Sequence, residues 1–452
     1  MSELQPLARG DVVGPEAALP PAKQEGGGEN REGRQTFWAV VGRAYWRGLL
    51  NRIATGWVVL ILLLTVVVPF LANDAPYTAV MKHFPVDAAG NPLPPVWVRE
   101  WPLFRDLTRV DWIWLAWGGV AVGYGLLRWT LRTGRGGRGG LSAEEEERRR
   151  YRHWMGTGIL LAAGIVASIG IAVGKHEYLD SRDYHQLVRQ QGNEAEMRDA
   201  VFPPLRWGYA QQEPLEAAKL FMEPGGDHLL GTDGNGRDVL ARLLWGARVV
   251  LEIGFVSEII SLVIGAFYGA MMGYFVGKVD LLGMRFVEIV EAVPLLFLLI
   301  TVVAVFGRQL FMIMVIIGAT GWTGIARFVR AEFLRIRQMD YVAAAKAMGL
   351  PLRNILFRHM LPNGLTPVIV SVTFGVAGNI VSESILSFLG IGVEPPTASW
   401  GAMLADAGDP GVVFRWWLAL APGLMIFLTV FAYNIIGEGL RDAIDPRLNK
   451  IE

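Results

Sequence analysis

The chain has 452 residues, of which 52% are hydrophobic and 19% are charged, and its formal net charge is zero. Soluble domains usually carry about 25% charged residues, and here the apolar residues occur in runs long enough to cross a bilayer, which excludes an ordinary soluble protein. The chain contains no cysteine, so disulfides, thiol catalysis and Cys-ligated zinc are excluded, and its six histidines show no metal-ligand spacing.

Residues 1–35 combine proline, glycine and charged residues without apolar periodicity. This composition is typical of disorder, and the segment lacks the short apolar core of a cleavable signal peptide. We expect a disordered cytoplasmic tail, followed at 36–75 by a basic lead-in and the first membrane span.

The apolar runs predict an all-α integral membrane protein with about eight transmembrane helices. A span requires roughly 20 mostly apolar residues. Eight stretches are candidates, at about 55–73, 111–130, 154–174, 249–275, 287–306, 309–329, 364–389 and 416–437. The second and third spans fall within 76–174, and the last five fall within 246–441.

Lysine and arginine residues in the short loops predict the orientation of these spans. Three arginines lie at 43–52, before the first span, and eight lie at 128–152, after the second. Both loops are therefore expected in the cytoplasm, which agrees with the two crossings between them. Continuing the count places 175–245 outside the membrane, and places the segment 327–362 and the tail 442–452 inside.

The polar stretch 340–363 lies between two spans and has helical spacing on both sides of Gly349. Asp340 is a good N-cap for a short helix, and Gly349 stands where a helix ends in a left-handed residue. Pro351 fits the first turn of a second helix, which Pro362 is expected to end. The stretch is thus predicted to be a bent helix pair with one apolar and one basic face. One interpretation is an amphipathic helix on the membrane surface.

Two glutamates fall within apolar spans, Glu258 in the fourth and Glu383 in the seventh. Such residues usually face a bundle interior or a water-filled cavity. Ser261 lies one helical turn after Glu258 and can share its face. These residues are either hydrogen-bonded helix contacts or parts of a transport pathway. Glu288 and Glu291 lie near the cytoplasmic end of the fifth span, where a charge costs little, and are expected to be interfacial.

Two further motifs carry no chemistry. The stretch GYFVGKVD (273–280) has three residues between its glycines and Val279 after its lysine, which does not fit a nucleotide-binding P-loop. The stretch GTDGNGRD (231–238) lacks the carboxylate pattern of an EF-hand. We expect it to cap the outer end of the fourth span, with Arg237 paired to Asp238.

The stretch AAAKAMGLPLRNILFRHMLP (343–362) resembles the cytoplasmic "EAA" loop of ATP-binding-cassette (ABC) importer permeases. The residues that match the family pattern are Ala344, Ala345, Gly349, Leu361 and Pro362. Ala343 stands where the family typically has Glu, and His359 stands where it typically has Ile. The spacing and the small residues, which set the shape of the loop, are intact.

Two more stretches resemble the C-type permease subunit of dipeptide, oligopeptide and nickel importers. HLLGTDGNGRDVLARLLWGAR (228–248) is similar to the segment before the core helices, and 386–448 is similar to the end of these permeases. The resemblance covers about 228–448 nearly continuously. It implies a type I permease bundle with a common six-helix pattern, to which the second and third spans are added as an inserted hairpin.

The resemblance implies a permease subunit that moves peptides or peptide-like solutes across the cell (inner) membrane, with both termini in the cytoplasm and no catalytic or metal-binding residues. The implied partners are a homologous second permease, two ATP-binding subunits that hold ATP and Mg, an extracytoplasmic solute-binding protein and membrane lipid, but no nucleic acid. The loop would dock on an ATP-binding subunit through Asp340, Tyr341, Ala344, Ala345, Gly349, Arg353, His359, Leu361 and Pro362. The pathway candidates are Glu258, Ser261 and Glu383.

The sequence leaves one alternative from another class open and argues against a second. A proton-driven secondary transporter could use Glu258 and Glu383 as relays, although the chain shows no repeat of span patterns between its halves. An intramembrane hydrolase would need a Ser/His pair or a metal constellation within a span, and the spans contain neither. The sequence does not define the solute, so nickel, glutathione and antimicrobial peptides stay open.

Overall fold

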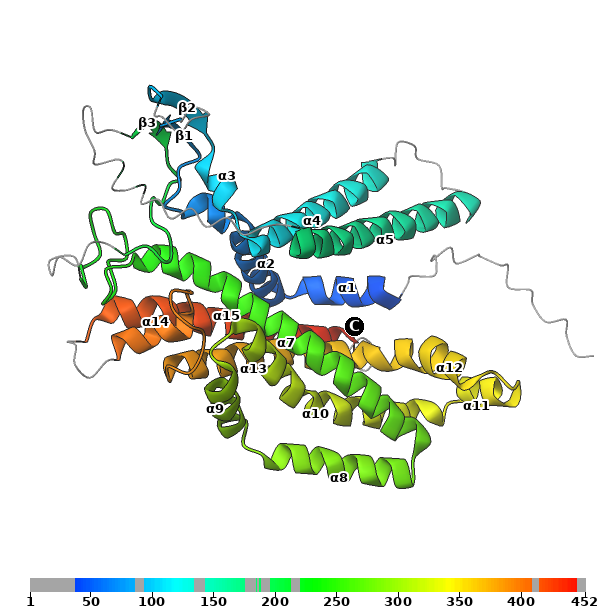
Figure 1. The fold of residues 1–452 in the computed structure, drawn as a ribbon. Helices are drawn as coiled ribbons and strands as arrows, with labels where there is room; N and C mark the ends of the chain where they lie inside the picture. The colour runs from blue at the N-terminus through cyan, green and yellow to red at the C-terminus, as the bar shows by residue number, and fades with distance from the viewer. Residues whose placement is uncertain are drawn as a thin grey trace, which may run out of the picture.

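The computed structural model describes residues 37–85, 93–133, 143–174, 184, 187, 196–212, 220–408 and 414–444. These residues are mostly helical (Figure 1), as the sequence predicted. The elements are α1 (Phe37–Arg47), α2 (Leu49–Leu71), β1 (Thr78–His83), β2 (Val96–Glu100), α3 (Pro102–Asp106), α4 (Arg109–Thr133), α5 (Ala143–Gly174), β3 (Met197–Val201), α7 (Val239–Phe275), α8 (Lys278–Ala292), α9 (Leu295–Phe306), α10 (Leu310–Arg337), α11 (Asp340–Ala347), α12 (Leu352–Asn354), a π-helical segment (Ile355–Met360), α13 (Leu361–Phe388), α14 (Trp400–Ala407) and α15 (Trp416–Ile444).

Within the described residues, seven helical stretches are long and apolar enough to cross a membrane, and the bent pair α8–α9 makes an eighth if it is one span. The fifth span was expected to be one helix over 287–306, and this is wrong, because α8 and α9 meet at 71°. Pro294 precedes α9, and Val293 before it is extended, with φ −83° and ψ 116°. A residue before proline avoids helical backbone, so the helix breaks there.

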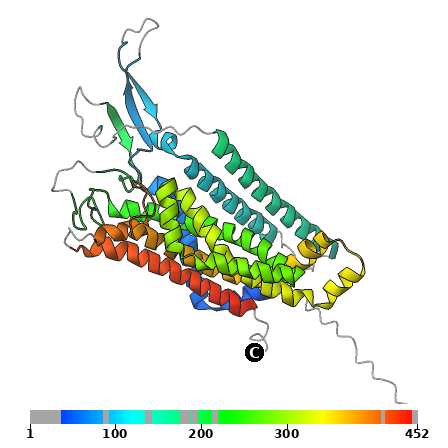
Figure 2. The same ribbon diagram turned by 60° about the horizontal axis from the view of Figure 1, so that its bottom comes forward.

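The central bundle is built around α7, which packs most extensively against α10 and also contacts α13. Figure 2 shows the long helices lying side by side with roughly aligned axes. Gly265, Gly269 and Gly273 follow one another at one-turn intervals on α7, and a Cβ on any of them would overlap atoms within residues 322–333 of α10. Small residues at this spacing permit close helix approach, so α7 and α10 form the tightly packed centre of the bundle.

The helices α4 and α5 form a hairpin that projects from the bundle (Figure 1). It packs against α2, where a Cβ on Gly118 would overlap Val66, and at the start of α4 Asp111 forms an ion pair with Arg248 of α7. One turn further on, Trp114 Nε1 donates a hydrogen bond to Glu252 of α7 at 2.7 Å. Within the spans Arg109–Trp129 and Met155–Val173, most of the hairpin surface is apolar and little of it is buried, as expected of helices that face lipid.

A small antiparallel sheet with strand order β2-β1-β3 follows α2 and was not predicted from the sequence. The strand β1 places Ala79 and Met81 in an apolar cluster with Leu103 of α3 and Met197 of β3. The strands have only five or six residues, and alternation over so short a run is a weak signal. Part of this sheet belongs to the extracytoplasmic segment 175–245 proposed from the sequence.

The turn before α7 holds the start of that helix. Asp238 Oδ1 accepts a hydrogen bond from the backbone N–H of Ala241 at 2.7 Å, and its Oδ2 lies 2.8 Å from Nδ1 of His228. The predicted cap is therefore confirmed, and α7 begins well before the predicted limit of the span. The predicted pairing of Arg237 with Asp238 is wrong, because Arg237 Nε donates to Asp233 at 2.7 Å.

Candidate functional site

The segment after α10 forms the predicted bend, at the end of the bundle away from the small sheet (Figure 1). Gly349 has a φ of +71°, the left-handed conformation that glycine tolerates best. The N–H of Leu350 donates to the carbonyl of Ala345 at 3.2 Å, which is the long bond of a Schellman ending. The N-cap of α11 is Met339, so Asp340 is the first residue of this helix and not, as was predicted, its cap.

The second half of this segment departs from the prediction. After Pro351, the short helix α12 continues through the π-helical segment directly into α13. Pro362 therefore does not end the helix but lies in the first turn of α13. A proline within a helix lacks an N–H and crowds the carbonyl four residues earlier, and the wider π-turn before it accommodates this interruption. The result is one helical stretch, Leu352–Phe388.

The predicted coupling residues differ in burial. Asp340, Tyr341, Ala344, Gly349, Arg353 and Pro362 are exposed, His359 and Leu361 are half-buried, and Ala345 is buried. Ala345 packs with Val342 in a cluster around Phe333 of α10, so it supports the bend from inside. The structure adds Met348 and Phe357, two large apolar side chains that are exposed beside these residues. Both stand within two residues of a basic residue in the sequence, and this proximity was the signal that could have identified them as exposed.

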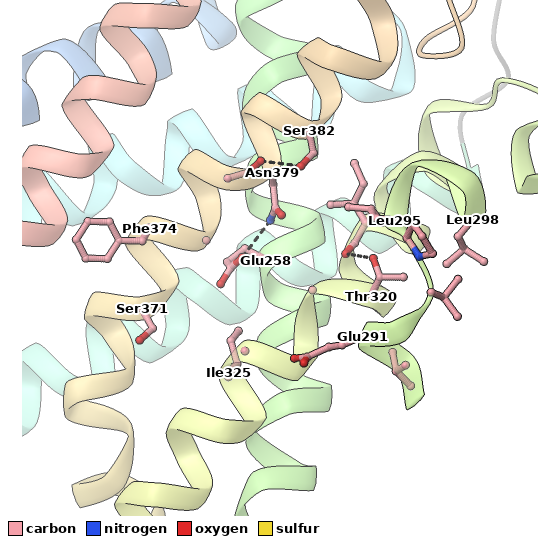
Figure 3. A pocket seen from close by; sticks show the side chains of 18 of the residues that line it. Glu258, Glu291, Leu295, Leu298, Thr320, Ile325, Ser371, Phe374, Asn379 and Ser382 are labelled. Atoms are coloured by element: carbon pink, nitrogen blue, oxygen red, sulfur yellow. Dashed lines mark hydrogen bonds between the residues drawn. The ribbon is translucent and has the colours of Figure 1, made fainter. Parts of the chain in front are cut away.

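A cavity of about 900 Å³ lies between α7, α10, α13 and the break between α8 and α9. Its polar lining residues are Glu258, Glu291, Thr320, Ser371, Asn379 and Ser382 (Figure 3). The other lining residues are apolar or glycine. Because α13 continues from the bend, one helical stretch carries both part of the predicted coupling segment and a wall of the cavity.

Glu258 extends from the middle of α7 toward α13 (Figure 3). Its Oε2 accepts a hydrogen bond from Asn379 Nδ2 at 3.0 Å. Within the described residues its Oε1 accepts no hydrogen bond, although the residue is only 4% exposed. The carboxylate lies against Gly375, where an added Cβ would overlap it. The glycine therefore leaves the space that the carboxylate occupies.

Glu291 lines another part of the cavity, near the end of α8, and pairs with Arg327 of α10. Asp280 at the start of α8 pairs with Arg330 of α10 in the same way. These two ion pairs hold α8 to α10. Glu288 forms an exposed pair within α8 and lies outside the cavity lining, so the two glutamates that were expected to be alike have different surroundings.

The cavity brings in Glu258 but neither of the other predicted pathway residues. Ser261 Oγ donates to the carbonyl of Gly318 at 2.8 Å, which fastens α7 to α10. Glu383 is fully buried, and its Oε1 accepts hydrogen bonds from Ser387 Oγ at 2.7 Å and Ser399 Oγ at 2.6 Å. Both residues are engaged in contacts between elements, away from the cavity lining.

Comparison with known proteins places part of the chain among transport proteins. Residues 265–450 match the model of a family described as binding-protein-dependent transport system inner membrane component. The chain is 44% identical over 222 residues to the oligopeptide transport system permease protein OppC of Haemophilus influenzae, covering 49% of this chain and 71% of that relative. It is 39% identical over 229 residues to the dipeptide transport system permease protein DppC of Bacillus subtilis, covering 51% and 72%. A solved structure of inward facing conformations of the MetNI methionine ABC transporter aligns with a TM-score of 0.38 and 20% identity, covering 45% of this chain and 96% of that chain.

Proposed function

The chain belongs to the family of binding-protein-dependent transport system inner membrane components, and from this premise we propose that it carries peptides or peptide-like solutes across the inner membrane in an ATP-driven importer. The chain is a transport permease, not an enzyme. The names of the relatives, which refer to oligopeptide and dipeptide transport, support peptides as the class of solute.

The proposed importer contains a second homologous permease, two ATP-binding subunits and an extracytoplasmic solute-binding protein, and it lies in membrane lipid without nucleic acid. The ATP-binding subunits hold ATP and Mg. In this arrangement both termini are cytoplasmic and 175–245 is extracytoplasmic. The region 76–174 is an insertion beside the permease domain at 246–441, and 340–362 is the contact with an ATP-binding subunit.

The observation that carries the coupling proposal is the continuity of the bend with the cavity wall. The stretch Leu352–Phe388 begins in the exposed bend and passes through Asn379, which holds Glu258. This stretch is helical throughout, although Pro362, Pro367 and the π-helical turn remove some of its regular backbone hydrogen bonds. A subunit that moves the bend therefore moves the wall of the cavity.

The substitution Gly349→Val tests this coupling. A side chain branched at Cβ tolerates φ +71° poorly, at a cost of about 1–2 kcal/mol. We expect ATP-driven uptake of a tripeptide by the complete importer in proteoliposomes to fall severalfold, with less ATP-binding subunit copurifying. Gly56→Val in α2 is the matched control, because residue 56 is exposed, lies in ordinary helical backbone outside 340–362, and an added Cβ would meet no atom within 4 Å.

Two outcomes would contradict the proposal. Wild-type uptake by the Gly349→Val importer would show that the bend does not couple ATP hydrolysis to transport. Uptake that follows an imposed pH gradient and persists with an ATP-binding subunit unable to hydrolyse ATP would support the proton-driven transporter instead.

A further inference from the structure

Glu258 lies near the middle of a membrane-spanning helix. The helix α7 runs from Val239 to Phe275, and Glu258 lies inside its apolar run at about 249–275, which was predicted to span the membrane. A carboxylate at this depth is costly unless it is paired or hydrated. Its surroundings therefore indicate what compensates it.

The cavity lining supplies no cation for this carboxylate. Among the described residues that line the cavity there is no lysine, arginine or histidine, and the second carboxylate, Glu291, is already paired with Arg327. The hydroxyls of Thr320 and Ser382 donate to carbonyls of their own helices at 2.9 Å. Among the residues that the structure describes, Glu258 thus has one neutral donor, the amide of Asn379, and one carboxylate oxygen without a hydrogen bond.

The cavity also leaves space beside the carboxylate. Gly324 of α10 and Gly378 of α13 both line it, and a Cβ added to either would meet no atom within 4 Å. The volume of about 900 Å³ is within the range of small-molecule sites. These positions leave room for a solute in the cavity, and the solute contacts Oε1, which is buried here, when the Glu258 side chain turns into that room.

We propose that Glu258, oriented by Asn379, is a binding site for an ammonium group of the transported solute. This inference rests on the proposed function. A primary ammonium group has three N–H donors and a positive charge, so it satisfies the free Oε1 and compensates the carboxylate in one contact. Peptides present this group at the amino terminus and on lysine side chains, and the chemistry of recognition is the same for both.

The test uses the complete importer in proteoliposomes and three tripeptides: Ala-Lys-Ala, its Nα-acetyl form and its Nε-acetyl form. Glu258→Gln keeps the size of the side chain and an oxygen that accepts from Asn379, but it removes the charge. We expect it to lower uptake of Ala-Lys-Ala about tenfold relative to wild type, mainly by raising KM. The loss of uptake should be much smaller for the peptide in which the recognised ammonium group is acetylated. A small loss for the Nα-acetyl form identifies the amino terminus as that group, and a small loss for the Nε-acetyl form identifies the lysine side chain.

Each uptake is expressed as the ratio of variant to wild type, which cancels selection by the solute-binding protein. Glu383→Gln is the matched control, since Glu383 is also buried but lies outside the cavity lining, and it should change all three ratios equally. If Glu258→Gln does not assemble with its partners, Glu258→Asp, which withdraws the charge by one methylene, should weaken the same preference to a smaller extent.

Equal ratios for the three peptides with either Glu258 variant would overturn the ammonium site. A loss for all three peptides that is restored by acidifying the outer solution would overturn it in favour of a bound proton. If wild-type importer takes up none of the peptides in the presence of ATP, the proposed function itself fails, which separates the two results.

Discussion

The middle of α7 and the end of α13 each bury a glutamate, but the two regions are built differently. Around Glu383, two serines donate to one carboxylate oxygen, and Gly401 brings α14 against the backbone of Ser384. Around Glu258, one amide donates and a cavity lies beside the carboxylate. Each glutamate keeps one oxygen without a hydrogen bond among the described residues. Burial alone therefore does not assign a role to a membrane carboxylate, whereas the space and the donors beside it do.

The largest effect on stability is expected from Gly401→Ala, in the packed region. The new Cβ would overlap the carbonyl oxygen of Ser384 and would lie only 2.8 Å from the Cα of Ser384. Because backbone cannot rotate out of the way, α14 must separate from α13, and overpacking of this kind costs about 3 kcal/mol. Thermal unfolding of the purified protein should show a clearly lower midpoint. Gly423→Ala in α15 is the control, since its Cβ would meet no atom within 4 Å. Equal unfolding midpoints for the two variants would contradict the close packing of α14 against α13.

The next effect is expected from Ser399→Ala, which removes a donor to Glu383. The Ser399 hydroxyl donates to Glu383 at 2.6 Å and also caps α14 by accepting from Ala402 N. Loss of the donor and the cap at a buried carboxylate should cost about 2 kcal/mol. Asn379→Ala removes the donor to Glu258 but no helix cap, so the unfolding midpoint should fall less. A larger fall for Asn379→Ala would reverse the comparison.

At the cavity, Gly375→Ala is expected to affect transport more than stability. The new Cβ would overlap the carboxylate of Glu258, which is the flexible end of a side chain and can move into the cavity. We expect the free energy of unfolding to change by less than about 1 kcal/mol and peptide uptake to fall severalfold. Gly423→Ala lies outside the cavity lining and its Cβ would meet no atom within 4 Å, so it should leave uptake near wild type. Unfolding of Gly375→Ala as severe as that of Gly401→Ala would remove the difference between the two regions.

Much of the fold could be predicted because its signals are local. The apolar runs located the spans. The turn that ends at Asp238 was predicted to cap the helix that proved to be α7, and Gly349 was predicted to end a helix in the left-handed conformation, as it does after α11. The break at Pro294 also had a local signal, but it was hidden in a run that is apolar on both sides of the proline. The continuation past Pro362 was missed because the π-helical turn that accommodates this proline has no reliable sequence pattern.

The candidate site could be predicted only in part, because its contacts join distant segments. Glu258 was found as a charge within an apolar run, but its partner Asn379 is 121 residues away on another helix. Glu258 and Glu383 look alike in sequence, since both are single carboxylates among apolar residues with serines nearby. The hydrogen-bond partner of Ser261 could not be predicted either, because its hydroxyl donates to the carbonyl of Gly318, which comes within reach only when α7 and α10 pack.

The smallest effect is expected from Ser382→Ala, which lies on α13 close to both regions. Ser382 is half-buried in the cavity lining, and its hydroxyl donates to the carbonyl of Gly378 in its own helix at 2.9 Å. The Gly378 carbonyl is part of the helix backbone, so loss of the hydroxyl leaves no buried side-chain group without a partner. We expect an unfolding free energy within about 0.5 kcal/mol of wild type and unchanged peptide uptake. Ser387→Ala, five residues further along the same helix, removes a buried donor to Glu383 at 2.7 Å and should cost about 1–2 kcal/mol. A smaller change in unfolding free energy for Ser382→Ala than for Ser387→Ala would show that α13 passes from a solvated part to a packed part between these two serines. Equal changes for the two variants would contradict this.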